Sequence, residues 1–126
     1  MTREPAGDTL ALRPLRGEVW LANLNPTLGH EQAGRRPILV VSVDAYNGSS
    51  TNLIIALPLT SKVRLLPDRV FLAPPEGGLK VHSDILCGQI RTISQERMLR
   101  RWGADHAGHA EYRGAHATAA IGAIGI

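Results

Sequence analysis

Short apolar runs interrupted by glycine and proline are the feature that most limits how this chain can fold. Thirteen glycines and eight prolines occur among its 126 residues, and many of them lie between apolar runs of strand length. Such spacing is typical of compact β structure, because glycine and proline mark the turns between short strands. A chain of this length has room for one domain with one core. The sequence therefore predicts a mainly β domain, of the α+β class, with short helices.

Five strands are predicted from these runs. The second is nearly continuous apolar sequence, Pro37-Ile-Leu-Val-Val-Ser-Val43, rich in β-branched residues, as in a strand that is covered on both faces. Pro58 near the end of the third run cannot donate to a ladder, which predicts a sheet edge or a bulge there. The predicted strands are Gly17–Asn23, Pro37–Val43, Asn52–Thr60, Asp68–Ala73 and Ser83–Ile93.

Helices are predicted only towards the C-terminal end of the sequence. Gln95–Arg101 follows Ser94, a residue type that caps helix N-termini well. A weaker C-terminal helix is predicted over about 107–121, where glycines lower the helix propensity. Residues 1–14 contain two prolines and little periodicity, so they are predicted to form a flexible extension. The single domain then covers residues 15–126.

Composition and charge exclude several classes of protein. No apolar run approaches the roughly 18 to 20 residues of a membrane-spanning helix, and no basic segment leads into an apolar stretch at the start, so a cytoplasmic protein is expected. The single cysteine, Cys87, excludes an intramolecular disulfide framework and a cysteine-based zinc cluster, and it is predicted to be a small buried hydrophobe. The net charge of +3 permits a nucleic-acid partner without indicating one.

The segment Leu24–Arg36, between the first two predicted strands, is the strongest candidate for a functional loop. It has about a dozen residues, whereas most connections have roughly 4 to 6. Because Pro37 biases Arg36 towards extended backbone, the Arg36 guanidinium projects from the mouth of the strand, where it suits a phosphate. The alternative is a solvated polar loop with two surface arginines. The polar candidates are His30, Glu31, Gln32, Arg35 and Arg36.

Other polar residues support weaker interpretations. Gln89 and Arg91, in the last predicted strand, either face a ligand or make structural hydrogen bonds, and the structural role is favoured. The arginines of the predicted helix Gln95–Arg101 are either solvated or in contact with phosphate. The histidines within residues 106–116 lack a thiolate or carboxylate at matching spacing, so the sequence predicts no metal site.

Four motifs follow one another along the chain. They are Arg16-Gly-Glu-Val-Trp, Asn25-Pro-Thr-Leu-Gly-His-Glu-Gln-Ala-Gly-Arg-Arg-Pro-Ile-Leu-Val-Val-Ser, Leu57-Pro-Leu-Thr-Ser and Ser83-Asp-Ile-Leu-Cys-Gly-Gln-Ile-Arg-Thr-Ile. In residue type, spacing and order they resemble the MazF/PemK family of toxin endoribonucleases, the mRNA interferases of bacterial toxin–antitoxin pairs. The resemblance spans about Arg16–Arg101, and its most specific part is Glu-Gln-Ala-Gly-x-Arg-Pro.

This resemblance implies a fold, an activity and partners. The implied fold is a small, strongly curved β-barrel, SH3-like and shared with the gyrase-poisoning toxin CcdB, that works as a homodimer. The implied activity is sequence-specific cleavage of single-stranded RNA without a metal or other cofactor, leaving a 2′,3′-cyclic phosphate and a 5′-hydroxyl. The implied inhibitor is a MazE-like antitoxin with an acidic segment that is disordered until it binds.

The resemblance also assigns roles to residues of this chain. Arg36 falls on the catalytic arginine of the family, Thr60 on its catalytic threonine and Glu31 on the acidic residue of its mobile loop. The residues expected to contact RNA are His30, Gln32, Arg35, Ser61, Gln89 and Arg91.

The general base is left open by these residues. The arginine side chain has a pKa above about 12, so a guanidinium is hard to deprotonate at neutral pH and suits charge stabilisation better. Glu31 is one candidate for accepting the 2′-hydroxyl proton. His30 is another, because an imidazole titrates near neutral pH, although family members more often carry serine at this position.

Two other functions fit the same pattern. One is a non-enzymatic toxin of the same fold that poisons DNA gyrase, but such toxins carry a tryptophan very near the C-terminus, and this chain ends Ala-Ala-Ile-Gly-Ala-Ile-Gly-Ile. The other is an RNA-binding module that has lost turnover. The Arg36 and Thr60 pattern favours the ribonuclease over both.

Overall fold

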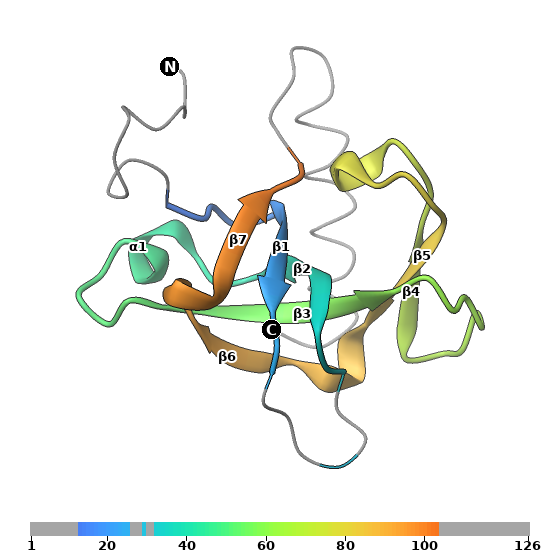
Figure 1. Cartoon of the computed structure of the whole chain (residues 1–126), viewed down its shortest axis with the longest axis horizontal. Helices are drawn as coiled ribbons and strands as arrows, with labels where there is room; N and C mark the ends of the chain where they lie inside the picture. Colours follow the sequence, from blue (N-terminus) through green and yellow to red (C-terminus); the bar gives the residue numbers. More distant parts are fainter. Residues whose placement is uncertain (1–12, 26–28, 30–31, 104–126) are drawn as a thin grey trace.

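The computed structural model describes residues 13–25, 29 and 32–103, which form a strongly curved antiparallel sheet with a few one-turn helices (Figure 1). The strands are β1 (Val19–Asn23), β2 (Arg35–Val40), β3 (Leu53–Thr60), β4 (Arg69–Leu72), β5 (Ser83–Leu86), β6 (Arg91–Ser94) and β7 (Met98–Arg101). The helices are α1 (Asp44–Asn47) and the 3-10 turns η1 (Glu76–Gly78), η2 (Cys87–Gln89) and η3 (Gln95–Arg97).

The long strand β3 is the centre of the sheet. One side of β3 pairs with β2, while its other side pairs first with β6 and then with β5. The strand order is β4-β5-β3-β2-β1-β7, with β6 joined to β3 beside this path. Within the described residues the path ends at β4 and β7, so the sheet curls like a barrel without closing. The mainly β, barrel-like fold predicted from the sequence is confirmed.

Pro58 lies inside the sheet and not at an edge, which was one of the two alternatives predicted for it. The Ile55 amide donates to Ser42 Oγ at 3.0 Å, and the Ile55 carbonyl accepts from the Val41 amide at 2.9 Å. Both backbone groups of Ile55 therefore point to the β2 side of β3. Because successive backbone groups of a strand alternate, the nitrogen of Pro58 faces the opposite side of β3. On that side the β6 pairing ends at Ala56 and the β5 pairing begins at Leu59. The missing N–H of proline therefore falls where β3 changes partner.

Both faces of the central strands are buried, as the apolar run Pro37–Val43 predicted. In β2 and just beyond it, Ile38 and Val40 join one apolar cluster, while Leu39 and Val41 join a second cluster on the other face. All four side chains are at most 2% exposed. Each such side chain stabilises the fold by about 1.5 to 3 kcal/mol relative to an exposed position.

Two predicted elements differ from the structure. The single strand predicted over Ser83–Ile93 is divided into β5 and β6 by η2, which lets the chain pass from one end of β3 to the other. The helix predicted over Gln95–Arg101 is wrong beyond its first turn. Ser94 does accept a bond from the Glu96 amide at 3.3 Å, but Met98–Arg101 is the strand β7, which pairs with β1.

Some predictions fall outside the described residues. The predicted C-terminal helix over about 107–121 lies there, as do residues 1–12 of the predicted extension. The last two residues of that extension lie against the domain, since Pro14 is buried and its carbonyl accepts a bond from Asn47 Nδ2 at 3.2 Å. Within the described part of the chain no helix is long and apolar enough to cross a membrane.

Candidate active site

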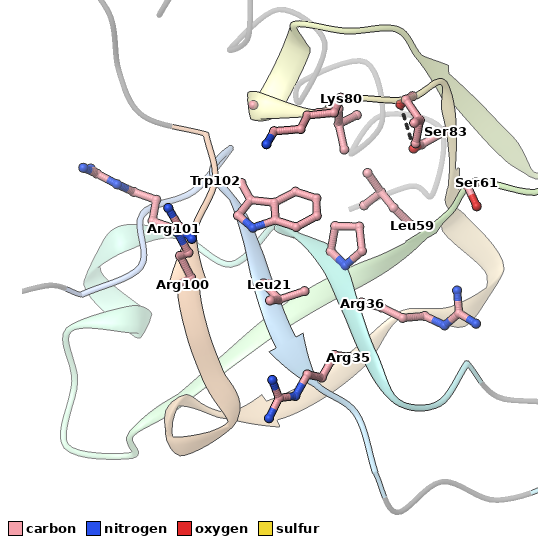
Figure 2. A pocket seen from close by; sticks show the side chains of 14 residues that line it. Leu21, Arg35, Arg36, Leu59, Ser61, Lys80, Ser83, Arg100, Arg101 and Trp102 are labelled. Carbon is pink, nitrogen blue, oxygen red and sulfur yellow. Dashed lines mark hydrogen bonds between the residues drawn. The ribbon is translucent and has the colours of Figure 1, made fainter.

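The beginning of β2 and the end of β3 border one cavity of about 550 Å³. Arg35 and Arg36 line it from β2, and Ser61 lines it directly after the last residue of β3. The turn that contains Lys80 forms another wall, and β7 with the residue that follows it completes the lining (Figure 2). Segments that are far apart in the sequence therefore meet around one hollow.

The cavity combines an apolar wall with positive charge. Its apolar lining consists of Leu21, Pro37, Leu59, Leu79, Val81 and Trp102. Its cationic lining consists of Arg35, Arg36, Lys80, Arg100 and Arg101. None of the described lining residues is acidic, so the cavity attracts anions.

Arg36 is half-buried, and its side chain is partly fixed. It pairs with Ala22 of β1 at the second position of β2, in the extended conformation that Pro37 favours. Its Nε donates to the carbonyl of Ala33 at 2.9 Å. Within the described part of the chain its two terminal nitrogens have no acceptor, so they remain available to a phosphate.

Thr60 is the last residue of β3 and is only 4% exposed. Its Oγ1 accepts a bond from the Lys62 amide at 3.2 Å. Thr60 is therefore buried at the end of its strand, where it pairs with Asp84 of β5. It still lies next to Ser61, which is exposed and lines the cavity.

Gln32 and Gln89 meet each other in the structure. The Gln89 side chain accepts a bond from the Gln32 amide at 3.0 Å, which ties the end of the long loop to η2. The same loop is closed by bonds of Gly34, whose amide donates to Asn25 Oδ1 at 2.9 Å and whose carbonyl accepts from the Leu24 amide at 2.9 Å. These contacts indicate that Gln89 positions the loop.

Arg91, His30 and Glu31 are not placed at the cavity by the structure. Arg91 pairs with Ala56 on β6, and its Nη1 is buried with no hydrogen-bond partner within the described chain. It is not one of the residues that line the cavity. His30 and Glu31 lie outside the described residues.

Lys80 and Trp102 are site residues that sequence patterns did not single out for the cavity. Trp102 directly follows β7 and packs against the apolar cluster that contains Val19. Arg100 and Arg101 were assigned to a helical face, and they reach the cavity because β7 pairs with β1. Only the tertiary pairing brings these residues beside Arg36, so no local signal could have found them.

Two of the arginines near this region have structural partners. Arg101 lies 3.5 Å from the buried carboxylate of Glu18. Arg97 is not part of the cavity lining, and its Nη1 donates to the carbonyls of Asn23 and Asn25 at the start of the long loop. Of the arginines in the predicted helix Gln95–Arg101, Arg97 therefore supports the long loop, whereas Arg100 and Arg101 line the cavity.

Cys87 is the buried hydrophobe that the sequence predicted. It is 6% exposed and packs within an apolar cluster. Burial raises the pKa of the Cys87 thiol, and the Asp68 carboxylate raises it further. Within the described residues, no three His, Cys, Asp or Glu side chains are grouped so that they could hold a metal ion.

The fold and the cavity together define a small curved-sheet protein with a cationic site for an anionic ligand. Residues 15–114 match the family model for PemK-like, MazF-like toxins of type II toxin–antitoxin systems, so the chain belongs to this family.

Curated relatives carry enzyme names. The chain is 39% identical over 90 residues to endoribonuclease MazF9 of Mycobacterium tuberculosis, an alignment that covers 68% of this chain and 76% of the relative. It is also 39% identical over 85 residues to endoribonuclease EndoA of Bacillus subtilis, covering 66% and 72% respectively. These names give no support to the gyrase-poison alternative.

Solved structures show the same fold. MazF from Deinococcus radiodurans superimposes with a TM-score of 0.72 at 32% identity, covering 90% of this chain and 94% of that chain. A MazE–MazF complex from the same organism superimposes with a TM-score of 0.66 at 31% identity, covering 89% and 92%.

Proposed function

We propose that this chain is a sequence-specific endoribonuclease toxin that cleaves single-stranded RNA without a divalent metal. The observation that carries the proposal is the cavity beside Arg36, whose described lining combines an apolar wall with cationic side chains and includes no acidic residue. The family to which the chain belongs and the enzyme names of its relatives support the reaction class.

The proposed reaction uses the ribose next to the scissile phosphate. Its 2′-hydroxyl attacks the phosphorus, the bond from phosphorus to the 5′-oxygen breaks, and the products are a 2′,3′-cyclic phosphate and a 5′-hydroxyl. Negative charge grows on the phosphoryl oxygens in the transition state, and a preorganised donor aimed at them contributes about 10²- to 10³-fold in rate. We assign this role to Arg36 and to the hydroxyl of Thr60. Glu31 and His30 are the candidates for accepting the 2′-hydroxyl proton.

RNA would lie along the cavity with phosphates on its cationic rim. The indole of Trp102 stands between Lys80 and Leu21 in the apolar wall (Figure 2), where an unpaired base can stack. Lys80 and Arg100 are exposed and suit neighbouring phosphates. The proposed RNA contacts in the cavity are Arg35, Ser61, Lys80, Arg100 and Trp102. The family resemblance adds His30, Gln32, Gln89 and Arg91 as proposed contacts beyond this lining.

The proposed partners follow from the same surface. An acidic antitoxin segment would compete with RNA for the cationic cavity, and a solved MazE–MazF complex of a relative supports an antitoxin partner. We assign the protein to the cytoplasm and expect it to act as a homodimer. The acidic segment would be disordered until it binds, because its charge keeps it from forming a core of its own.

The test is to incubate a long single-stranded RNA with the purified protein in EDTA and to map the ends of the products. The proposal expects cuts at one short sequence, with a cyclic phosphate upstream and a 5′-hydroxyl downstream of each cut. A strict requirement for an added divalent metal would refute the metal-independent reaction. Cuts without any shared sequence would refute the specificity.

A further inference from the structure

Asp84 on β5 is a fully buried carboxylate that organises the loop after β3. It is 0% exposed, and its Oδ2 accepts three bonds. The donors are the Arg64 amide at 2.8 Å, the Leu65 amide at 3.3 Å and Arg69 Nη1 at 3.2 Å.

Leu65, in the loop after β3, has a positive φ of 51°. At 51° the Leu65 backbone lies in the left-handed region, which is unfavourable for leucine. Its amide is one of those that Asp84 binds. The buried carboxylate therefore helps to hold the loop in a conformation that it would not adopt alone.

A continuous path of hydrogen bonds links this carboxylate to Thr60. Arg69 Nη1, which contacts Asp84, also donates to the Lys62 carbonyl at 3.1 Å. The amide of Lys62 in turn donates to Thr60 Oγ1 at 3.2 Å. The position of the Thr60 hydroxyl thus depends on a loop that Asp84 and Arg69 hold.

Asp84 also lies directly beside Thr60. The two residues are paired in the β3–β5 register, so their side chains lie on the same face of the sheet. Asp84 Oδ1 is buried with no hydrogen-bond partner within the described chain. Because the Thr60 oxygen already accepts from Lys62, the Thr60 hydroxyl still has its proton to donate. A buried, unpaired carboxylate oxygen is costly and therefore calls for an explanation.

We propose that Asp84 and Arg69 form a positioning pair for the Thr60 hydroxyl, an inference that rests on the role of Thr60 under the proposed function. The pair fixes the loop whose Lys62 amide occupies one lone pair of Thr60 Oγ1. Asp84 Oδ1 makes no hydrogen bond within the described chain, and we assign to its negative charge the role of orienting the hydroxyl proton from across the β3–β5 pair. When RNA binds, the hydroxyl donates to a phosphoryl oxygen. Neither residue touches the substrate.

The test is a double-mutant cycle between Asp84→Asn and Thr60→Ala, read as the single-turnover cleavage rate at saturating protein. In the parent background, Asp84→Asn is expected to lower this rate by about 10- to 100-fold while RNA affinity changes by less than about twofold. In the Thr60→Ala background the same substitution is expected to have almost no further effect. Equal losses in both backgrounds would show that Asp84 acts on the fold in general, which overturns the proposal.

A matched control separates positioning from stability. Ser42→Ala removes a buried hydroxyl that bonds Asn47 and the Ile55 amide, away from the Thr60 end of β3. It is expected to lower the melting temperature without changing the cleavage rate. Arg69→Lys is the milder second variant should Asp84→Asn fail to fold, and its rate loss is likewise expected to vanish in the Thr60→Ala background.

A second readout does not depend on cleavage. Hydrogen exchange at the Lys62 and Arg64 amides is expected to rise in Asp84→Asn and to stay at the parent level in Ser42→Ala. Unchanged exchange at both amides would overturn the proposal even if RNA is cut. If the parent protein cuts no RNA, the proposed function fails while this exchange result still reports on the loop. If Thr60→Ala cuts at the parent rate, the Thr60 hydroxyl does not contribute to cleavage, and this result overturns the positioning role of Asp84 and Arg69 as well.

Discussion

Arg36 owes its place to the residue that follows it. Pro37 restricts Arg36 to extended backbone, so the side chain leaves the start of β2 beside the cavity. Arg36→Ala is expected to lower the cleavage rate by about 10²- to 10³-fold, because the main donor to the phosphoryl oxygens is lost. Thr60→Ala is expected to lose most of the activity as well. The measurement is a single-turnover time course with circular dichroism as the check on folding.

Arg35→Ala is the matched control for the arginine, because Arg35 is the neighbouring cation on the same cavity. It is expected to weaken RNA binding in a salt-dependent way and to leave the chemical step nearly intact. A folded Arg36→Ala or Thr60→Ala protein that cleaves at the parent rate would show that the role assigned to that residue is wrong.

Glu31 and His30 differ in the pH dependence that each would produce. Glu31→Ala is expected to be milder than Arg36→Ala, since a loop can reorganise around a lost carboxylate. A loss as large as that of Arg36→Ala would instead make Glu31 the general base.

An unperturbed histidine base gives a rate that rises around pH 6.5, whereas a glutamate base is already ionised there. Rate profiles of the parent and of His30→Ala distinguish the two, and a profile unchanged by His30→Ala would exclude the imidazole.

At the scale of elements, the turn around η1 is fixed by its glycines. Gly78 has a φ of 75°, and a Cβ added there would lie 2.1 Å from the backbone oxygen of Trp102. This turn therefore packs against the end of β7 so closely that no side chain fits between them. Trp102, a wall of the cavity, is held in place by that contact.

Gly78→Ala is expected to destabilise the protein by about 3 kcal/mol, through both backbone strain and the clash with Trp102. Gly34→Ala is the matched control, because Gly34 has a φ of 77° with nothing within 4 Å of the added Cβ. It carries only the strain and is expected to cost about 1 kcal/mol. Urea unfolding measures both, and equal losses would contradict the close-packing explanation.

Elements with a strong local signal were predictable from the sequence. The apolar run Pro37–Val43 predicted a strand buried on both faces, and the structure confirms it for Ile38–Val41, although β2 ends at Val40 and Val43 is 50% exposed. The segment Met98–Arg101 was not predictable, because its residues favour helix locally and pairing with β1 overrides that preference. The same pairing explains why Arg100 was missed as a cavity residue.

Within the site, the motif around Arg36 was recognisable because its residues lie next to one another. The residues that hold the loop after Thr60 were not recognisable. Asp84 on β5 and Arg69 on β4 are distant from this loop in the sequence and contact it only in the folded chain. Sequence spacing therefore predicted the residues proposed for the chemistry and missed those that support them.

At the scale of the whole molecule, we predict a homodimer. Several large apolar side chains of the described chain are at least 41% exposed, among them Leu65, Phe71 and Val81, and a partner subunit would cover part of this surface. Sedimentation at micromolar concentration is expected to give about 27 kDa, twice the chain mass of 13.6 kDa. A clean monomer would contradict the prediction.

An acidic antitoxin peptide that bound without slowing cleavage would contradict a shared surface for RNA and antitoxin.

The central claim is that the cavity beside Arg36 cleaves RNA by attack of the neighbouring 2′-hydroxyl. The most direct test uses an oligonucleotide that carries one 2′-deoxyribose immediately upstream of the mapped cut, incubated with the protein in EDTA. We predict that it binds like the all-RNA oligonucleotide and stays intact, because the nucleophile is missing. Cleavage of this oligonucleotide at the same phosphate would contradict the account.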